Sequence, residues 1–317
     1  MTEPFVRPDV RTFLDYLNNL PGPRSHELGP AEARRLMLAS REVADAPTGA
    51  LASIRDLACP GPDGSELRLR LYDAREAREA GPLFLFFHGG GFVLGDLDTH
   101  EPFCAELARA LDLPVLAVDY RLAPEHPFPA GAEDCIAAAR WAAQSQAALG
   151  RGVTGLVPCG DSAGGNLAIV VSLALRDAPA AVPVLAQWPI YPAADPAKGY
   201  PSYQDFAQGY LLTGEGMDWF DACYRPVKAD WRYSPLLKSQ AGMPPTLVVT
   251  AGLDPIRDQG RAYAAACAEA GVPTIFREAR GNIHGFINLR RAIPSSEADL
   301  AGCFEALKLL LGESKAR

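Results

Sequence analysis

Short continuous apolar runs alternate with longer segments of helical spacing along most of the chain. Strands are predicted at 83–87, 114–120, 153–159, 183–190, 246–252 and 273–279. Helices are predicted at 99–110, 130–148, from 163 onward, 258–270 and 295–311. Strands that are apolar throughout bury both faces, and helices between them supply the crossovers of parallel strands. The pattern therefore predicts an α/β fold with a mainly parallel sheet covered by helices on both faces.

Two segments break this rhythm. Residues 1–47 carry helical patterns interrupted at PGPRS and ADAPTG, and they have no obvious place in the sheet. The stretch 191–237 is rich in Tyr, Trp, Phe, Pro and Gly and stands where a single crossover helix is expected. Between them, ALASIRDLACP and ELRLRLYD flank the turn PGPDGS, which indicates a β-hairpin. We therefore divide the chain into an N-terminal helical part, 1–47, and a core, 48–190 and 238–317, interrupted by an insertion at 191–237.

Charge and cysteine content narrow the classes of partner. The 317 residues carry a net charge of -8 and contain no block of Lys and Arg, which argues against nucleic acid and anionic membrane surfaces. The sequence has no apolar run long enough to span a membrane, and its start, MTEPFVRPDV, lacks the regions of a secretory signal. The cysteines are scattered without a C-x-x-C, so we expect neither a disulfide framework nor a zinc site. These features predict a cytoplasmic protein.

A serine stands among small residues where the strand at 153–159 meets the following helix. The motif is G-D-S-A-G, with Ser162 at its centre. A sharp strand-to-helix turn lifts one side chain out of the backbone and tolerates only small neighbours, as in the nucleophile elbow G-x-S-x-G. The alternative is a structural serine that caps a helix N-terminus. The strand–turn–helix setting favours the nucleophile.

A serine hydroxyl needs a base, and the base needs a group that orients it. In this type of sheet the acid and then the histidine follow the serine, and only His284 of the five histidines lies after Ser162. Asp254 comes immediately after the strand at 246–252, and Asp258 comes about one helical turn later. We predict Asp254 as the acid because loops at strand ends form such sites, and we assign Asp258 to a helix N-terminus.

A glycine-rich loop, H-G-G-G-F, follows the strand at 83–87. Consecutive glycines let backbone N–H groups turn toward a developing negative charge, which a side chain would obstruct. We predict that Gly89, Gly90 and Ala163 supply the donors of an oxyanion hole. The alternatives are a flexible loop and a phosphate cradle. A phosphate cradle would end in Lys and Ser or Thr, whereas this loop continues with Phe and Val. His88 precedes the serine and is interpreted as part of the loop architecture.

Five motifs together resemble the hormone-sensitive-lipase-like esterases of the α/β-hydrolase superfamily. They are HGGGF (88–92), DYRLAPEHPFPA (119–130), GDSAG (160–164), GLDPIRD (252–258) and HGF (284–286), in the order and approximate spacing of that family. The resemblance implies an eight-stranded, mainly parallel sheet with a helical cap built from 1–47 and 191–237. It also implies a carboxylic-ester hydrolase that uses Ser162, Asp254 and His284 and needs no metal or organic cofactor.

The resemblance leaves the ester itself undetermined. We expect a small-molecule ester of short to medium acyl chain, because an insertion of under fifty residues with many Pro and Gly should roof a shallow cleft. The cap aromatics line the acyl pocket or form the cap's own core, and Asn282, where many relatives have Met, leaves local pocket contacts open. An amidase or a lipase on the same triad is the alternative, the presence of His284 argues against a ligand receptor, and a homodimer is left open. The candidate substrate-binding residues are Phe92, Tyr191, Phe206, Tyr210 and Phe286.

Overall fold

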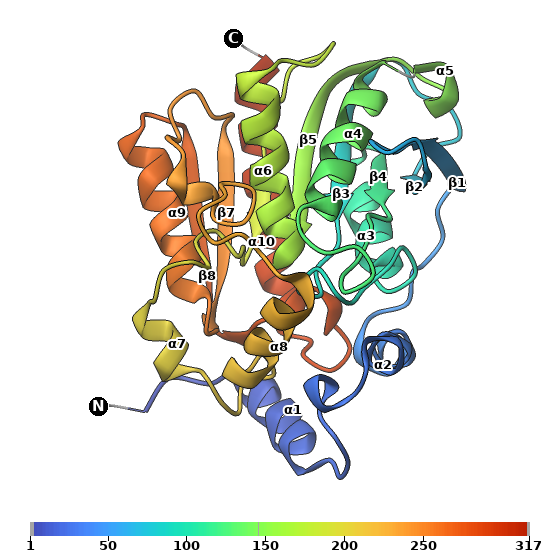
Figure 1. Cartoon of the computed structure of the whole chain (residues 1–317). Coiled ribbons are helices and arrows are strands. Elements are labelled where there is room, and N and C mark those ends of the chain that lie inside the picture. Colours follow the sequence, from blue (N-terminus) through green and yellow to red (C-terminus); the bar gives the residue numbers. More distant parts are fainter. Residues whose placement is uncertain (1–2, 145, 316–317) are drawn as a thin grey trace.

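An eight-stranded sheet forms the centre of the computed structural model, which describes residues 3–144 and 146–315 (Figure 1). Its strands follow the order β1-β2-β4-β3-β5-β6-β7-β8. The first two pairings, β1 with β2 and β2 with β4, are antiparallel, and all others are parallel. The strands are β1 (Ser53–Pro60), β2 (Glu66–Asp73), β3 (Gly81–Phe87), β4 (Val115–Val118), β5 (Val153–Asp161), β6 (Trp188–Ile190), β7 (Thr246–Leu253) and β8 (Thr274–Ile283).

The predicted hairpin and the predicted mainly parallel sheet are both confirmed. One strand is shorter than expected, because the run at 183–190 forms a continuous ladder only over β6. Its earlier part is attached through isolated bridges, from Val184 to β5 and from Gln187 to β7. Pro183 and Pro189 have no N–H to donate, so this segment cannot build an uninterrupted ladder.

Helices cover both faces of the sheet, as predicted from the alternation. Apolar side chains of α4, α6 and α9 pack on one face, and those of α3 and α10 pack on the other. The helices are α3 (Glu101–Leu111), α4 (Ala130–Gln144), α5 (Gln146–Leu149), α6 (Ala163–Asp177), α9 (Arg257–Glu269) and α10 (Ser296–Lys315). The single helix expected at 130–148 corresponds to α4 and α5, and residue 145 lies outside the described residues. No helix in the described part of the chain is both long and apolar enough to cross a membrane.

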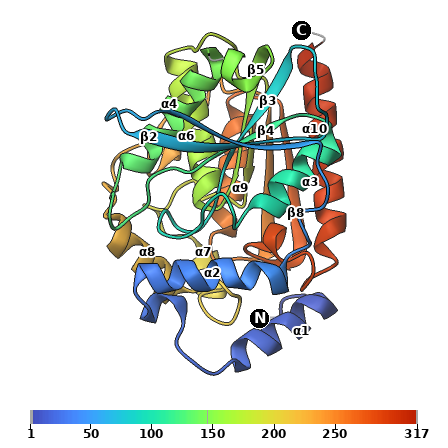
Figure 2. The ribbon, with the colours of Figure 1, turned by 90° about the vertical axis from the view of Figure 1, so that its right-hand side faces the viewer.

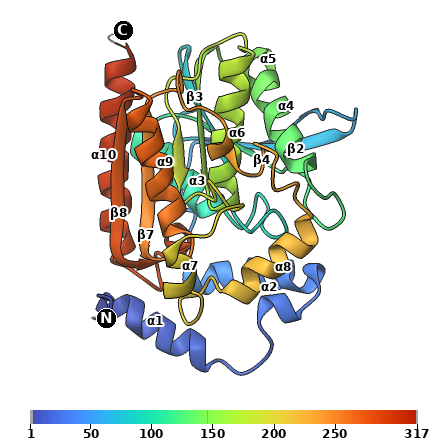
Figure 3. The same ribbon diagram turned by 60° about the vertical axis from the view of Figure 1, so that its left-hand side comes forward.

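The N-terminal helices and the insertion lie at one end of the molecule, below the carboxyl ends of the parallel strands (Figures 2 and 3). Helix α8 contacts the short 3-10 helix η1, so the two chain segments meet there. The elements of this layer are α1 (Pro8–Asn19), η1 (Ser25–Glu27), α2 (Pro30–Ala44), α7 (Pro201–Asp205) and α8 (Gly214–Tyr224). Two further 3-10 turns are η2 (Pro235–Leu237) and η3 (Phe286–Asn288).

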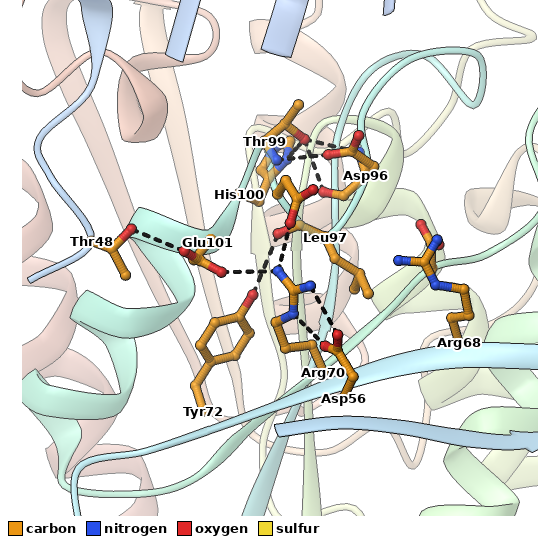
Figure 4. Close-up of polar contacts among 12 residues, drawn as sticks. Thr48, Asp56, Arg68, Arg70, Tyr72, Asp96, Leu97, Thr99, His100 and Glu101 are labelled. Atoms are coloured by element: carbon orange, nitrogen blue, oxygen red, sulfur yellow. Dashed lines mark hydrogen bonds and ion pairs between the residues drawn. The ribbon is translucent and has the colours of Figure 1, made fainter. Parts of the chain in front are cut away.

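An arginine on β2 ties the hairpin to the segment that leads into α3 (Figure 4). Arg70 donates to Asp56 on β1 at 2.6 Å, to Asp98 at 2.6 Å and to Glu101 at 2.9 Å. Thr48, at the end of the N-terminal segment, donates to the same Glu101 at 3.3 Å. The hydrogen bond to Asp56 raises the pKa of the guanidinium above its usual value despite burial. This network fixes the base of the loop that precedes α3.

Candidate active site

Ser162 occupies a sharp turn between β5 and α6. Its backbone has φ 57° and ψ -116°, which is rare for a residue with a side chain. A Cβ on Gly164 would lie 1.8 Å from the carbonyl oxygen of Phe87, and one on Gly160 would lie 2.3 Å from that of Gly164. Both positions therefore need glycine, which explains the small residues that flank the serine in the sequence.

Three side chains from three strand ends form a chain of hydrogen bonds. His284 Nε2 lies 2.8 Å from Ser162 Oγ, and His284 Nδ1 lies 2.7 Å from Asp254 Oδ2. The other carboxylate oxygen of Asp254 accepts from the amide of Ile256 at 2.9 Å. A carboxylate only accepts hydrogen bonds, so Nδ1 carries the imidazole hydrogen and Nε2 is left to accept the serine proton. Asp254 is fully buried, which shields this charge from water.

Asp258 belongs to a separate structural arrangement, in the first turn of α9. One of its oxygens accepts from the amide of Ser202 at 3.1 Å, and the other pairs with Arg257 at 2.8 Å and Arg261 at 3.2 Å. Burial alone would raise the pKa of Asp258, but the hydrogen bond and charge of Arg257 outweigh it and hold the pKa below its usual value. The structure thus brings Asp254, and not Asp258, to the histidine.

The glycine-rich loop differs from expectation at one donor. The amide of Gly89 donates to Asp161 Oδ1 at 2.7 Å, so its single hydrogen is already used and the prediction for Gly89 as an oxyanion donor is wrong. Among the described residues, the amides of Gly90 and Gly91 have no protein acceptor. Ala163 is the first residue of α6, where the helix supplies no acceptor either. Gly91, which sequence reasoning missed, lies with Ala163 on the wall of the cavity that contains the serine.

This loop is held in an unusual conformation. All three residues of 90–92 have positive φ, and for Phe92, with φ 62°, the left-handed region costs about 1–2 kcal/mol. The amide of Leu94 donates to the carbonyl of Gly90 at 2.8 Å, and the hydroxyl of Tyr120 donates to the carbonyl of His88 at 2.7 Å. Strained backbone persists only where such surroundings fix it, and these bonds fix both ends of the loop.

A buried charge lies directly behind the serine. His100 Nε2 lies 3.3 Å from Asp161 Oδ1, and Tyr191 donates its hydroxyl to Oδ2 at 3.4 Å. Burial would raise the pKa of Asp161, but His100 and the amide of Gly89 outweigh it, so this pKa is lowered. The neighbouring His88 is fully buried, and burial together with His100 lowers its pKa to about 4. His88 is therefore neutral at pH 7 and serves the loop, as interpreted from the sequence.

Ser162 opens into a cavity of about 370 Å³ between the sheet and the cap elements. Its wall is mixed rather than purely apolar. Aromatic and aliphatic side chains face it together with four charged ones. The lining residues include Phe92, Lys198, Tyr203, Leu212, Met217, Asp218, Phe220, Asp221, Lys228, Tyr233, Ile256 and Gln259.

Of the five predicted substrate-binding residues, only Phe92 lines this cavity. Tyr191 is buried behind it, against the His284 ring at 4.7 Å, and packs edge-on against Phe286. Phe206 and Tyr210 pack with apolar residues of α1 and of the loop after β8. Their prediction as pocket residues is therefore corrected. The cap aromatics that do line the cavity are Tyr203 and Phe220.

Comparison with known proteins places this geometry in a family. A family model described as alpha/beta hydrolase fold matches residues 84–288. "Carboxylic ester hydrolase LipN" of Mycobacterium tuberculosis is 41% identical over 269 residues, which cover 80% of this chain and 70% of the relative. "Ethyl acetate hydrolase" of Pseudomonas putida is 36% identical over 289 residues, which cover 89% of this chain and 91% of the relative.

Solved structures give the same result. An alpha/beta hydrolase enzyme from the metagenome of Lake Arreo, Spain, superposes with a TM-score of 0.90 at 38% identity, covering 98% of each chain. A thermostable esterase from Pseudomonas putida ECU1011 superposes with a TM-score of 0.91 at 29% identity, covering 98% of this chain and 99% of that one. By family match, relatives and fold, the chain belongs to the α/β-hydrolase fold family and, within it, to the hormone-sensitive-lipase-like esterases that its motifs resemble.

Proposed function

We propose that this protein is a serine carboxylesterase that hydrolyses small esters through an acyl-enzyme intermediate. One observation carries the proposal: Ser162, His284 and Asp254 form a continuous hydrogen-bonded chain whose serine end opens into the cavity. The relatives named as ester hydrolases support the same reaction class. In the proposed roles, Ser162 is the nucleophile, His284 is the base and Asp254 is the acid.

The first half of the reaction follows from the arrangement of hydrogen bonds. His284 Nε2 takes the proton of Ser162 as the serine oxygen attacks the ester carbonyl. Asp254 holds the ring in the tautomer that leaves Nε2 free, and it stabilises the imidazolium that forms. The imidazolium then gives its proton to the departing alcohol. Water attacks the acyl-enzyme in a second cycle of the same proton transfers and releases the acid.

The negative oxygen of the tetrahedral intermediate needs fixed donors. We assign this role to the amides of Gly90, Gly91 and Ala163, since that of Gly89 is occupied by Asp161. Backbone donors aimed at developing charge in a site with little water stabilise the transition state more than the ground state. The α6 N-terminus, where Ala163 lies, adds the positive end of a helix dipole.

We further propose that residues 1–47 and 191–237 act together as the cap, and that the acyl pocket is small. A cavity of about 370 Å³ stands at the low end of the usual 300–1,000 Å³ range of small-molecule sites. Its wall carries Lys198, Asp218 and Lys228, which a long alkyl chain would desolvate unfavourably. Both features favour short- to medium-chain soluble esters.

The test is steady-state hydrolysis of p-nitrophenyl esters from acetate to palmitate, with matched anilides and an emulsified triglyceride. We expect kcat/KM to be highest for short to medium chains, and Ser162→Ala to lower kcat by a factor on the order of 10⁶. Faster turnover of anilides would indicate an amidase. A rise toward long chains with activation on the emulsion would indicate a lipase. Absence of turnover on every substrate would leave a ligand receptor.

A further inference from the structure

Cap helix α8 reaches back onto the glycine-rich loop with two aromatic side chains. A Cβ on Gly91 would meet the ring of Phe220 at 2.3–2.6 Å, so this ring lies directly against the glycine. One helical turn later, Tyr224 stacks on Phe92 with ring centroids 4.1 Å apart and ring planes 7° apart. Residues four apart share a helix face, so a single face of α8 covers both loop residues.

The helix is itself fixed to the core at this point. The carbonyl of Tyr224 accepts from the amide of Phe128 at 2.9 Å, and the two rings meet edge to face at 5.6 Å. Three residues earlier, Asp221 accepts from the hydroxyl of Tyr233 at 2.6 Å. Helix α8 therefore presents its two rings to the loop from a held position.

We propose that Phe220 and Tyr224 are positioning residues for the reaction: they hold Gly91 and Phe92 in the left-handed conformation that aims the loop amides at the oxyanion. This inference rests on the proposed function. Hydrogen bonds fix the loop at Gly90 and beyond, whereas the backbone between Gly91 and Phe92 is covered by these two rings. Without them, Phe92 is free to relax from its positive φ, which would turn the neighbouring peptide units.

The expected signature differs from that of a pocket wall. Donors to an oxyanion act on the transition state, so their displacement lowers kcat and leaves KM nearly unchanged. Phe220 also faces the cavity, and Met217 faces it from the same helix, one turn earlier. Met217→Ala therefore reports the loss of pocket surface, and Phe220→Ala reports that loss together with any displacement of the loop.

Tyr224 offers a second matched pair. Its ring is buried, and its hydroxyl has no hydrogen-bond partner among the described residues. Tyr224→Phe keeps the stacked ring and should leave kcat unchanged. Tyr224→Leu removes the flat surface against Phe92 and should lower kcat in the same way as Phe220→Ala.

The experiment measures kcat, KM and the inhibition constant of a trifluoromethyl ketone, whose serine adduct places an oxyanion at the donors. Phe220→Ala should lower kcat by about 10-fold to 100-fold and weaken the inhibitor similarly, since misplacement by 1 Å can cost about 100-fold. Met217→Ala should change KM only. Circular dichroism checks folding, and Phe220→Leu replaces the alanine variant if that variant does not fold.

Two results would overturn the inference while leaving the esterase intact. One is a change in KM alone for both Phe220→Ala and Met217→Ala, with inhibitor affinity unchanged. The other is a Tyr224→Leu variant as active as Tyr224→Phe. Failure of the proposed function is recognised separately, because the wild-type protein would then hydrolyse no ester and would not react at Ser162 with a fluorophosphonate.

Discussion

Removal of one buried carboxylate should destabilise the protein far more than removal of an exposed one. Asp45 follows α2 and binds Arg290, which lies just past η3, through Nε at 2.7 Å and a second guanidinium nitrogen at 3.0 Å. Asp45 is 1% exposed and Arg290 is 5% exposed. The same junction carries two backbone bonds, from the amides of Arg291 and Ala292 to the carbonyl of Ala44. Asp45→Asn would leave the guanidinium buried without its counter-charge.

The magnitude follows from this burial. Breaking a buried pair by removing one partner costs about 3–5 kcal/mol, because a charge stays in a poorly solvated place. Replacing both partners with apolar residues of similar volume is often nearly neutral. We therefore expect Asp45→Asn to lower the free energy of unfolding by about 3–5 kcal/mol. The double variant Asp45→Leu with Arg290→Met should recover most of that loss.

The assay is urea unfolding followed by fluorescence and circular dichroism. The matched control is the exposed pair Glu32–Arg35 on α2, for which Glu32→Gln should cost less than about 1 kcal/mol. A similar cost for Asp45→Asn and Glu32→Gln would refute the reasoning. So would a double variant less stable than Asp45→Asn alone, since the pair would then be favourable beyond the cost of burying its charges.

Three further outcomes are expected. Asp254→Asn should lower kcat by roughly 10⁴, because the amide favours the wrong imidazole tautomer, whereas Asp258→Asn should cost only about 0.5–1 kcal/mol of stability; kinetic loss with Asp258→Asn alone would exclude Asp254 as the acid. Burial raises the pKa of six thiols, so iodoacetamide at pH 7.5 should modify at most the half-buried Cys223 of the native protein, and peptide mass analysis showing several modified cysteines would contradict the fold. Burial and the neighbouring His100 lower the pKa of His88 to about 4, so the unfolded chain binds more protons below pH 6.5; roughly 3 kcal/mol of stability should be lost between pH 6.5 and pH 4, and urea unfolding of His88→Gln should show a correspondingly shallower pH dependence.

The parts of the site that depend on local turns could be predicted from the sequence. Gly160 and Gly164 are required by contacts within a few ångströms of the serine, so the elbow is visible in five consecutive residues. His284 and Asp254 follow the ends of apolar strands, and parallel strands bring their ends to one edge of the sheet. The structure brings these side chains into hydrogen-bonding distance, and their catalytic roles stay predictions.

The parts that depend on long-range partners could not be predicted. The amide of Gly89 is taken by Asp161, a residue on another strand, and nothing in H-G-G-G-F shows which of its amides is used in this way. Tyr203 and Tyr210 are both aromatic residues of the insertion, yet only Tyr203 faces the cavity, because the path of the cap backbone decides it. The pairing of Asp45 with Arg290 joins distant segments and has no local pattern.

The central claim is that Ser162 is the nucleophile of an esterase, and one measurement tests it most directly. The native protein is treated with a fluorophosphonate, the residual hydrolysis of p-nitrophenyl butyrate is followed, and the adduct is located by peptide mass spectrometry. The account predicts a single adduct on Ser162 that forms in proportion to the loss of activity, and no adduct in Ser162→Ala. An adduct on another residue with the same loss of activity, or full activity after complete modification of Ser162, would contradict it.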